Sequence, residues 1–445
     1  MLKGVKVPHR KNTAEMAPVR LPPPETVVIP MSMHIGAPAV PAVKVGETVK
    51  VGQLIAEAGG FVSSPVYASV SGKVKKIDEI PASNGRKMKA VVIASDGLME
   101  PWEGIARPEV KDFESFVAAV RSSGVVGLGG AGFPTAVKLG VKDLSKVEAF
   151  IINGAECEPY VTSDTRTMLD RLDDLKDGVA LLEKYMEAKR IIFGVEANKP
   201  RCIEALRSAF SSDSRVEINA LPPMYPQGGE KVLIYNTTGR IVPEGKLPLD
   251  AGAIVLNVTT LASIARYINT GMPLVEKVVT VDGSAVAEPK IVIAPIGTPA
   301  RALFEFCGGF KEEPCKVLYG GPMMGIAMPD ADLPIMKNTN AVLALNEADS
   351  RLPKPTACIR CGTCVDVCPL GLMPTLIEDA YERGDGQRLK ELKVNLCMEC
   401  GSCAYACPAK RPLVQVHKLA KGILNVYNAK LKAEAEKKAA KEAAK

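Results

Sequence analysis

Two cysteine runs near the C-terminal end constrain this chain more than any other feature of its sequence. The first run, CIRCGTCVDVCP, carries Cys358, Cys361, Cys364 and Cys368 before Pro369. The second run, CMECGSCAYACP, carries Cys397, Cys400, Cys403 and Cys407 before Pro408. Each reads C-x2-C-x2-C-x3-C-P, so a short loop can wrap three corners of a cube while the fourth cysteine points the opposite way. The spacing therefore predicts iron–sulfur clusters of the cubane type.

We expect the fourth cysteine of each run to serve the cluster of the other run, as in bacterial ferredoxins. One 4Fe–4S cluster is then held by Cys358, Cys361, Cys364 and Cys407. The other is held by Cys397, Cys400, Cys403 and Cys368. Paired C-x2-C motifs also bind zinc, but two four-cysteine runs that each close on proline favour iron–sulfur. Residues 370–396 have helical periodicity, which predicts a mostly helical ferredoxin-like module.

Length and composition indicate a globular protein of several domains. A chain of 445 residues is too long for one ordinary core. Its 47% hydrophobic and 24% charged residues are typical of soluble domains. No apolar run reaches the length of a membrane span, and the first residues show no apolar segment of a signal peptide. We therefore expect the protein on the cytoplasmic side, where its cysteines do not form disulfides.

The net charge of +6 does not predict a nucleic-acid partner. Residues 412–445 contain eight lysines and three glutamates, so most of the excess charge lies in the C-terminal tail. The rest of the chain is close to neutral, whereas a nucleic-acid groove needs clustered basic residues on the body of the protein. This tail, at 413–445, predicts a basic helix that is either solvated or in contact with anionic lipid or a membrane partner.

The N-terminal part is expected to contain two segments. Residues 1–30 are proline-rich and predict an extended arm. Short strands over 31–100 resemble the two halves of a biotinyl- or lipoyl-type barrel-sandwich domain. The expected hairpin tip lacks the lysine tripeptide that carries a prosthetic group, so we expect a structural or docking role.

Three further domains follow. Alternating strands and helices over 101–270 predict an α/β domain with a parallel sheet. Residues 271–348 predict a soluble-ligand-binding β-grasp domain, and residues 349–412 contain the double-cluster module.

A glycine loop at the start of the α/β domain contains the fingerprint G-x-G-x-x-G at Gly127, Gly129 and Gly132. A dinucleotide-binding Rossmann loop needs a strand immediately before it. Here an amphipathic helix over 109–123 precedes the loop, and the strand at 147–153 follows it. No Gly-Lys-Ser/Thr follows, which excludes a Walker A loop. The loop leads into a helix start, a combination that suits a phosphate or a flavin edge.

Three other polar motifs follow predicted strands. These are NGAECEPYV after the first strand, YPQGGEKVLI with a second glycine pair, and NVTTLA at another strand end. In open α/β sheets, ligands bind in the crevice outside the carboxyl ends of the strands. The sequence therefore predicts that these motifs and the glycine loop surround one site.

GLGGAGFPTAVK, NGAECEP, YPQGGEKVLI and NVTTLA, in this order, resemble the flavin- and NADH-binding subunit of respiratory complex I. The N-terminal barrel and the two cysteine runs do not fit that subunit. Together with the four motifs, they resemble the C-subunit of the Rnf complex (RnfC), a membrane-bound ferredoxin:NAD oxidoreductase. This resemblance covers residues 4 to 418, approximately the whole chain, and implies a central Rossmann-like FMN/NAD domain.

The resemblance implies a cofactor site in that domain. Its FMN side would consist of Gly127, Gly129, Lys138, Asn153, Glu156, Asn257 and Thr260. Its NAD(H) side would consist of Gly130, Phe133, Glu158, Tyr225 and Glu230. The chain departs from the complex I pattern at Leu128, Ala155 and Gly229. Core packing of Phe133, and capping of the following turn by Glu156 and Glu158, are the alternative interpretations of these residues.

The resemblance also implies a function. Hydride would pass between NAD(H) and FMN without a catalytic acid or base from the protein, and electrons would pass singly through two 4Fe–4S clusters. The chain would lie peripherally on the cytoplasmic face of the membrane. Its partners would be other Rnf subunits, and it would reach ferredoxin through one of them. The alternative is a flavin-free iron–sulfur electron-transfer adaptor of a related membrane complex.

Overall fold

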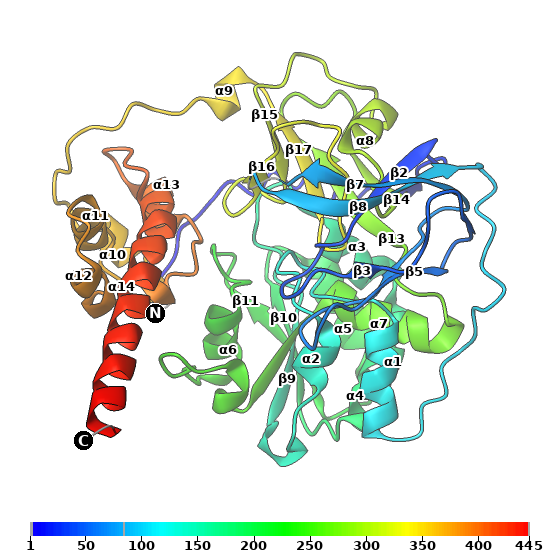
Figure 1. Cartoon of the computed structure of the whole chain (residues 1–445), viewed down its shortest axis with the longest axis horizontal. Helices are drawn as coiled ribbons and strands as arrows, with labels where there is room; N and C mark the ends of the chain where they lie inside the picture. Colours follow the sequence, from blue (N-terminus) through cyan, green and yellow to red (C-terminus); the bar gives the residue numbers. More distant parts are fainter. Residues whose placement is uncertain (1–2, 83–84, 444–445) are drawn as a thin grey trace.

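The computed structural model describes residues 3–82 and 85–443. Figure 1 shows the barrel, the α/β domain and the β-grasp domain packed together, with the helical cysteine module at one side. Within the described residues, no helix combines the length and the hydropathy needed to cross a membrane.

The N-terminal strands form two small sheets around a shared apolar core. One sheet has the order β2-β8-β7-β4, from Thr26–Pro30, Lys87–Ser95, Gly72–Pro81 and Thr48–Val49. The other has the order β3-β5-β6, from Val40–Pro41, Leu54–Glu57 and Val66–Tyr67. Val27 and Ile29 of the first sheet and Ile55 of the second belong to one buried cluster. This arrangement is the predicted barrel sandwich.

The structure differs from the predicted arm at residues 1–30 in its last part. Thr26–Pro30 is strand β2 of the barrel, because Val27 and Ile29 alternate with half-exposed neighbours once the proline-rich stretch has ended. Val19–Arg20 forms the short strand β1, which pairs with β14, Lys290–Pro295, of the β-grasp domain. The described residues before Val19, 3–18, belong to none of the sheets, and among them Val5 makes an isolated bridge to Tyr225.

The central domain contains a four-stranded parallel sheet with the order β11-β10-β9-β12. Its strands are Val216–Leu221, Ile191–Glu196, Ala149–Asn153 and Ala253–Asn257. The helices are α1 Phe113–Ser122, α2 Thr135–Leu139, α3 Ser163–Asp170, α4 Leu172–Tyr185, α5 Pro200–Ala209, α6 Glu230–Thr238 and α7 Val258–Thr270. Short 3-10 turns lie at Leu144–Lys146 and Pro248–Ala251.

Alternate residues of β9 point to opposite faces of this sheet, as strand geometry requires. Phe150 and Ile152 belong to the large cluster beneath α1, α4, α5 and α7. Ile151 belongs to the cluster beneath α6. The near-continuous apolar strands are therefore explained by burial on both faces, and Figure 1 shows α6 on the side opposite α1 and α4.

Helix α4 packs closely on α7 at Gly178, where a Cβ atom would lie 2.7 Å from Leu261 Cγ. We expect Gly178→Val to lower the free energy of unfolding by about 1–3 kcal/mol, because the added atoms overpack this contact. Ala180→Val, at an exposed position of the same helix, should change it by less than about 0.5 kcal/mol. Thermal or denaturant unfolding checks the pair. Equal stability of the two variants would contradict the close packing.

The β-grasp domain has one mixed sheet with the order β1-β14-β13-β17-β15-β16. Beyond β1, the strands are Lys290–Pro295, Glu276–Asp282, Ala341–Leu345, Lys316–Tyr319 and Ile326–Ala327. Its helix α8, Ala300–Phe306, packs on the sheet through Leu303 and Phe304. The short helix α9, Glu347–Ser350, ends the domain.

The cysteine module is mostly helical, as its periodicity predicts. Its helices are α10 Thr363–Asp366, α11 Pro374–Glu382, α12 Gly386–Glu391, α13 Ser402–Ala406 and α14 Leu413–Ala443, with a 3-10 turn at Val394–Leu396. Ile377, Leu389 and Leu424 form its apolar core. The first part of α14 thus packs within the module, while its basic end projects away from it (Figure 1).

Candidate functional site

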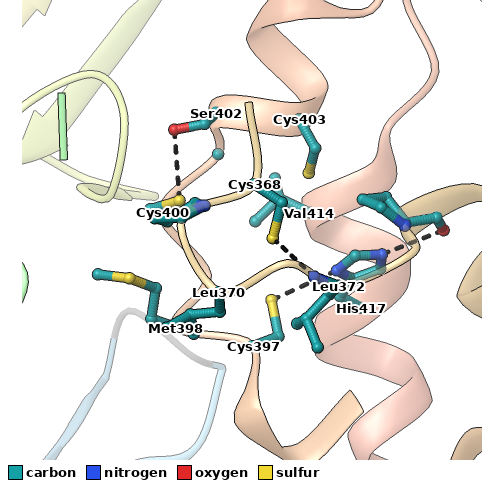
Figure 2. A pocket seen from close by; sticks show the side chains of 13 residues that line it. Cys368, Leu370, Leu372, Cys397, Met398, Cys400, Ser402, Cys403, Val414 and His417 are labelled. Carbon is teal, nitrogen blue, oxygen red and sulfur yellow. Dashed lines mark hydrogen bonds between the residues drawn. The ribbon is translucent and has the colours of Figure 1, made fainter. Parts of the chain in front are cut away.

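Four cysteines surround one cavity in the helical module. Figure 2 shows Cys368 from the first run beside Cys397, Cys400 and Cys403 from the second. The rest of the lining is mostly apolar, with Leu372 among its residues, and also includes Ser402 and His417. The structure thus brings together the four thiols that the crossed spacing assigns to one cluster.

The other group is nearer the surface. Cys364 lies in one buried cluster with Cys407 of the second run, and the Cys361 and Cys407 thiols both contribute to raising the Cys364 pKa, after burial as the main cause. Cys358 and Cys361 are exposed. The two groups of cysteines therefore differ in their access to solvent.

The two loops have the same local backbone geometry. Arg360 and Glu399 occupy the same place in their runs, and both have positive φ, at 55° and 59°. In this conformation the Arg360 N–H donates to Cys358 Sγ, and the Glu399 N–H donates to Cys397 Sγ, each at 3.4 Å. Backbone donors aimed at the sulfurs stabilise thiolate charge, so these loops suit iron–sulfur ligation.

Burial makes the inner thiols weak acids when no metal is bound. It raises the pKa of Cys397 to about 11 and that of Cys403 to about 12. Binding a cluster therefore requires proton release from these groups. Among the described residues, no three His, Cys, Asp or Glu side chains close on a position for a single metal ion.

The glycine loop lies between α1 and α2, without a strand before it. The Gly127 N–H donates to Phe133 O at 2.8 Å, and the Gly132 N–H donates to Gly127 O at 3.0 Å. Gly130 has φ of 118° with open space around its Cα, so a side chain there would be strained but would meet no neighbour. Backbone hydrogen bonds thus hold the loop together between Gly127 and Phe133, whereas none of the described residues beyond its chain neighbours has a heavy atom within 4 Å of the place where a Cβ of Gly130 would be.

Two asparagines mark the carboxyl ends of adjacent strands opposite this loop. Asn153 of β9 and Asn257 of β12 are paired in register. A Cβ at Gly129 would lie 2.8 Å from Asn257 Nδ2, and Thr260 Oγ1 accepts the Leu128 N–H at 2.9 Å. The structure therefore places the loop glycines and the strand-end polar residues against each other.

Lys138 and Glu230 also meet at this place, although the sequence interpretation assigned them to different ligands. Lys138 Nζ lies 2.7 Å from Glu230 Oε1 and donates to Val255 O at 3.0 Å. Both side chains are partly exposed. The ion pair links α2 to the first residue of α6 and lies near the end of β12.

Residues 155–161, which we call the acidic turn, follow strand β9. The carboxylates of this turn, on Glu156 and Glu158, accept hydrogen bonds from other groups of the protein. Glu156 accepts from the Asp164 N–H at 2.6 Å and the Thr165 hydroxyl at 2.6 Å. Burial raises its pKa to about 7. Glu158 accepts the Met323 and Met324 N–H groups of the β-grasp domain at 3.0 and 2.8 Å. The Glu156 contacts, at the start of α3, are of the capping kind given as the alternative interpretation, whereas the Glu158 contacts come from the β-grasp domain.

Residues 225–230, which we call the YPQGGE loop, contact both the sheet and the cysteine module. Its Tyr225 is almost fully buried and donates its hydroxyl to Cys400 O at 2.7 Å. Asn153 Nδ2 donates to Gly228 O at 2.9 Å. Gly229 packs so closely on Met398 that a Cβ would lie 2.2 Å from Met398 Cε. The loop thus touches both a strand end and a residue that lines the cysteine cavity.

Sequence interpretation missed residues that come from distant segments. Asn338 Nδ2 of the β-grasp domain donates to Gly130 O at 2.8 Å. Lys11 and Lys199 donate to carbonyl groups of the acidic turn. No local pattern marks these residues, because each contact joins segments that are far apart in the sequence.

Four family models match successive parts of the chain. Residues 1–98 match the RnfC barrel sandwich hybrid domain, and residues 120–266 match the Nuo51 FMN-binding domain. Residues 278–327 match the SLBB domain, and residues 352–409 match the 4Fe-4S dicluster domain. The predicted multidomain α/β fold is confirmed, as is the prediction of an FMN-binding domain and an iron–sulfur domain.

Curated relatives align over most of the chain. The C-subunit of the proton-translocating ferredoxin:NAD(+) oxidoreductase complex of Clostridium ljungdahlii is 43% identical over 87% of this chain and 86% of its own length. The C-subunit of the Na(+)-translocating ferredoxin:NAD(+) oxidoreductase complex of Acetobacterium woodii is 44% identical over 94% of this chain and 95% of its own. The C-subunit of the ion-translocating oxidoreductase complex of Rhodobacter capsulatus is 39% identical over 94% and 81%. By this identity and by its order of domains, the chain belongs to the RnfC family, the C-subunits of Rnf complexes.

Proposed function

We propose that this chain is the NAD(H)-reactive subunit of a membrane-bound, ion-translocating ferredoxin:NAD oxidoreductase complex. It exchanges hydride between NAD(H) and FMN and relays single electrons through two 4Fe–4S clusters. The activity for which the Clostridium and Acetobacterium relatives are named supports this proposal. The observation that carries it is the YPQGGE loop, whose Gly228 contacts Asn153 at the strand end and whose Gly229 contacts Met398 beside a cysteine cavity.

The polar residues where the glycine loop meets the strand ends suit FMN. When bound, FMN supplies a group that takes up hydride and gives up electrons one at a time. We assign Gly127, Gly129, Lys138, Asn153, Glu156, Asn257 and Thr260 to its site. The two asparagines offer amide groups at the carboxyl ends of the sheet, where ligands of open α/β sheets bind, and Lys138 offers a cation suited to a phosphate.

The NAD(H) side is assigned to Gly130, Phe133, Glu158, Tyr225 and Glu230. The open space at Gly130 allows a flat ligand to approach the backbone. None of these residues needs to act as an acid or base, because the protein's task in hydride transfer is to orient the reactants and exclude water.

The two cysteine groups are assigned one 4Fe–4S cluster each. Their sulfur ligands, the apolar lining of the inner cavity and the backbone N–H donors fit such clusters. The inner cluster would lie against the YPQGGE loop, and the outer one would lie beside the exposed Cys358 and Cys361. This order suits a relay from the flavin side to the surface of the module.

We place the chain peripherally on the cytoplasmic face of the membrane, with the other Rnf subunits as partners and ferredoxin reached through one of them. The relatives' names, which describe subunits of ion-translocating complexes, support this assembly. The basic end of α14 offers a surface for these partners or for anionic lipid.

The test is reconstitution of the purified chain with FMN, iron and sulfide. NADH should then bleach the visible absorbance of the flavin under anaerobic conditions, and the cluster absorbance should fall after it. Binding of clusters without FMN would instead support the flavin-free electron-transfer adaptor, and bound flavin that stays oxidised with excess NADH would contradict the proposed reaction with NAD(H).

A further inference from the structure

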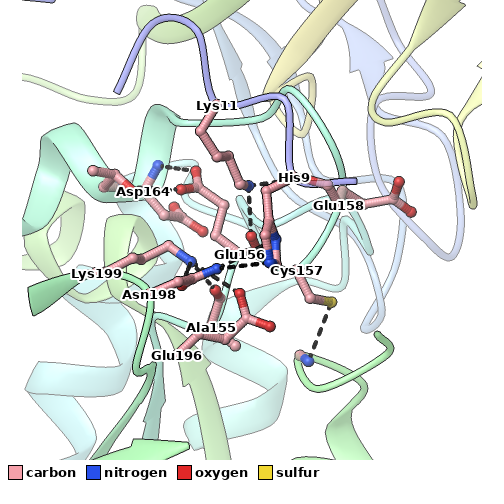
Figure 3. Close-up of polar contacts among 12 residues, drawn as sticks. His9, Lys11, Ala155, Glu156, Cys157, Glu158, Asp164, Glu196, Asn198 and Lys199 are labelled. Atoms are coloured by element: carbon pink, nitrogen blue, oxygen red, sulfur yellow. Dashed lines mark hydrogen bonds and ion pairs between the residues drawn. The ribbon is translucent and has the colours of Figure 1, made fainter. Parts of the chain in front are cut away.

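Residues 9–11 of the N-terminal arm make several hydrogen bonds to the acidic turn of the α/β domain. Figure 3 shows Lys11 directed into this turn, with His9 beside it. The Tyr160 N–H donates to His9 O at 3.0 Å, and Arg10 Nη1 donates to the Tyr160 hydroxyl at 2.6 Å. A part of the chain that belongs to the matched barrel domain thus reaches the proposed cofactor site.

Lys11 makes three of these hydrogen bonds. Its Nζ donates to the carbonyl oxygens of Glu156, Glu158 and Val161, at 2.7, 2.8 and 2.5 Å. An ammonium group has three donors, so each proton of Lys11 is matched to one carbonyl of the turn. This contact therefore fixes the backbone on both sides of Glu158.

The turn needs such support because two of its residues adopt an unfavourable backbone conformation. Glu156 has φ of 48° and Tyr160 has φ of 69°. Left-handed conformations are disfavoured for residues that carry a Cβ and persist only where the surroundings hold them. Lys11 binds the carbonyl of Glu156 itself, and Arg10 holds the side chain of Tyr160.

A second buried lysine holds the start of the same turn. Lys199 Nζ donates to Ala155 O at 2.6 Å and forms an ion pair with Glu196 Oε2 at 3.0 Å. Lys199 comes from the α/β domain itself and carries its own counter-ion, whereas Lys11 enters from the arm and binds only carbonyls in the turn. Together with Met323 and Met324 of the β-grasp domain, which bind Glu158, Lys11 thus makes the turn depend on segments outside the α/β domain.

We propose that Lys11 is a positioning residue for the NAD(H) side of the site, acting through the backbone of the acidic turn. The inference rests on the proposed function, because it takes Glu158 as part of the NAD(H) side. Without the Lys11 ammonium, three carbonyls lose their donor and the strained turn can relax. Glu158, whose Oε1 lies 3.4 Å from the Tyr225 hydroxyl, is then displaced, and the dinucleotide is bound less tightly.

The experiment compares flavin- and cluster-loaded variants of the full chain by their affinity for ADP-ribose, a redox-inert part of NAD(H). We expect Lys11→Met to raise the dissociation constant about tenfold or more, as misplaced binding groups do, and to raise the NADH concentration for half-bleaching in parallel. FMN and iron content should stay at the wild-type values. Lys11→Arg, which keeps donors at this place, should recover part of the affinity.

Lys6→Met is the matched control, since Lys6 lies exposed on the same arm. It should bind ADP-ribose as the wild type does. Wild-type affinity in Lys11→Met would overturn the inference and leave the proposed function intact. A wild-type chain that binds neither ADP-ribose nor NADH would overturn both. If Lys11→Met does not fold, Arg10→Leu decides: weaker ADP-ribose binding supports the inference, and unchanged binding overturns it.

Discussion

Replacement of Cys368 together with Cys400 by alanine is expected to leave the chain with roughly half of its iron, although the two residues belong to different cysteine runs. In the crossed arrangement both are ligands of one cluster, so the double variant loses that cluster and keeps the other. Cys368 and Cys400 line the same cavity. Colorimetric iron and acid-labile sulfide per chain, with the visible absorbance of the clusters, measure the outcome.

The comparison variant is Cys368→Ala with Cys361→Ala, two residues of the same run. The crossed arrangement assigns them to different clusters, so this variant should retain almost no intact 4Fe–4S cluster. If each run held its own cluster, the opposite would be observed. The variant of Cys368 and Cys400 would then lose both clusters, and the variant of Cys368 and Cys361 would keep one. Cys315→Ala, an exposed cysteine outside both runs, should keep the full iron content.

The grouping of Cys368 with cysteines of the second run around one cavity could be predicted from sequence, because ligand spacing is a local property. The x2 spacers fix a loop, and the loop fixes the direction of its thiols, whatever the rest of the chain does. The parallel sheet was predictable for a similar reason. β9, β10 and β12 are short apolar runs, and strands buried on both faces have this composition.

The contacts that complete the proposed site could not be predicted in this way. Lys11 and Glu156 are 145 residues apart, and nothing near Lys11 distinguishes it from the other basic residues of the arm. The pairing of Lys138 with Glu230 depends on how α2 and α6 approach the end of β12. Strand β2 was hidden because the proline-rich stretch directly before it is typical of an extended arm.

The glycine loop shows how a motif and its context differ in what they predict. The fingerprint alone indicates a Rossmann loop, whereas the helix before it excludes one, and the structure indeed has α1 there and no strand. What the loop does instead follows from its neighbours. Gly129 faces Asn257, and the residue before it, Leu128, is held by Thr260.

This close approach makes Gly129→Trp the most informative change in the α/β domain. A Cβ at residue 129 would already lie 2.8 Å from Asn257 Nδ2 and 3.1 Å from its Cγ, so the indole must occupy the place assigned to FMN or displace Asn257. We expect the variant to lose FMN and NADH-dependent bleaching almost completely. The cysteines lie in a separate module, so its iron content should equal that of the wild type.

A loss of FMN through unfolding would mimic this result, and the structure suggests how to separate the two. Asn257 caps helix α7 by accepting the Thr260 N–H at 3.1 Å, and loss of such a cap costs about 1 kcal/mol, which a chain of this size should tolerate. Gly422→Trp, at an exposed glycine with no neighbour within 4 Å, adds the same side chain elsewhere and should bind FMN normally. FMN at the wild-type ratio in a folded Gly129→Trp chain would place the flavin away from Gly129 and Asn257, because no flavin could share the space with an indole.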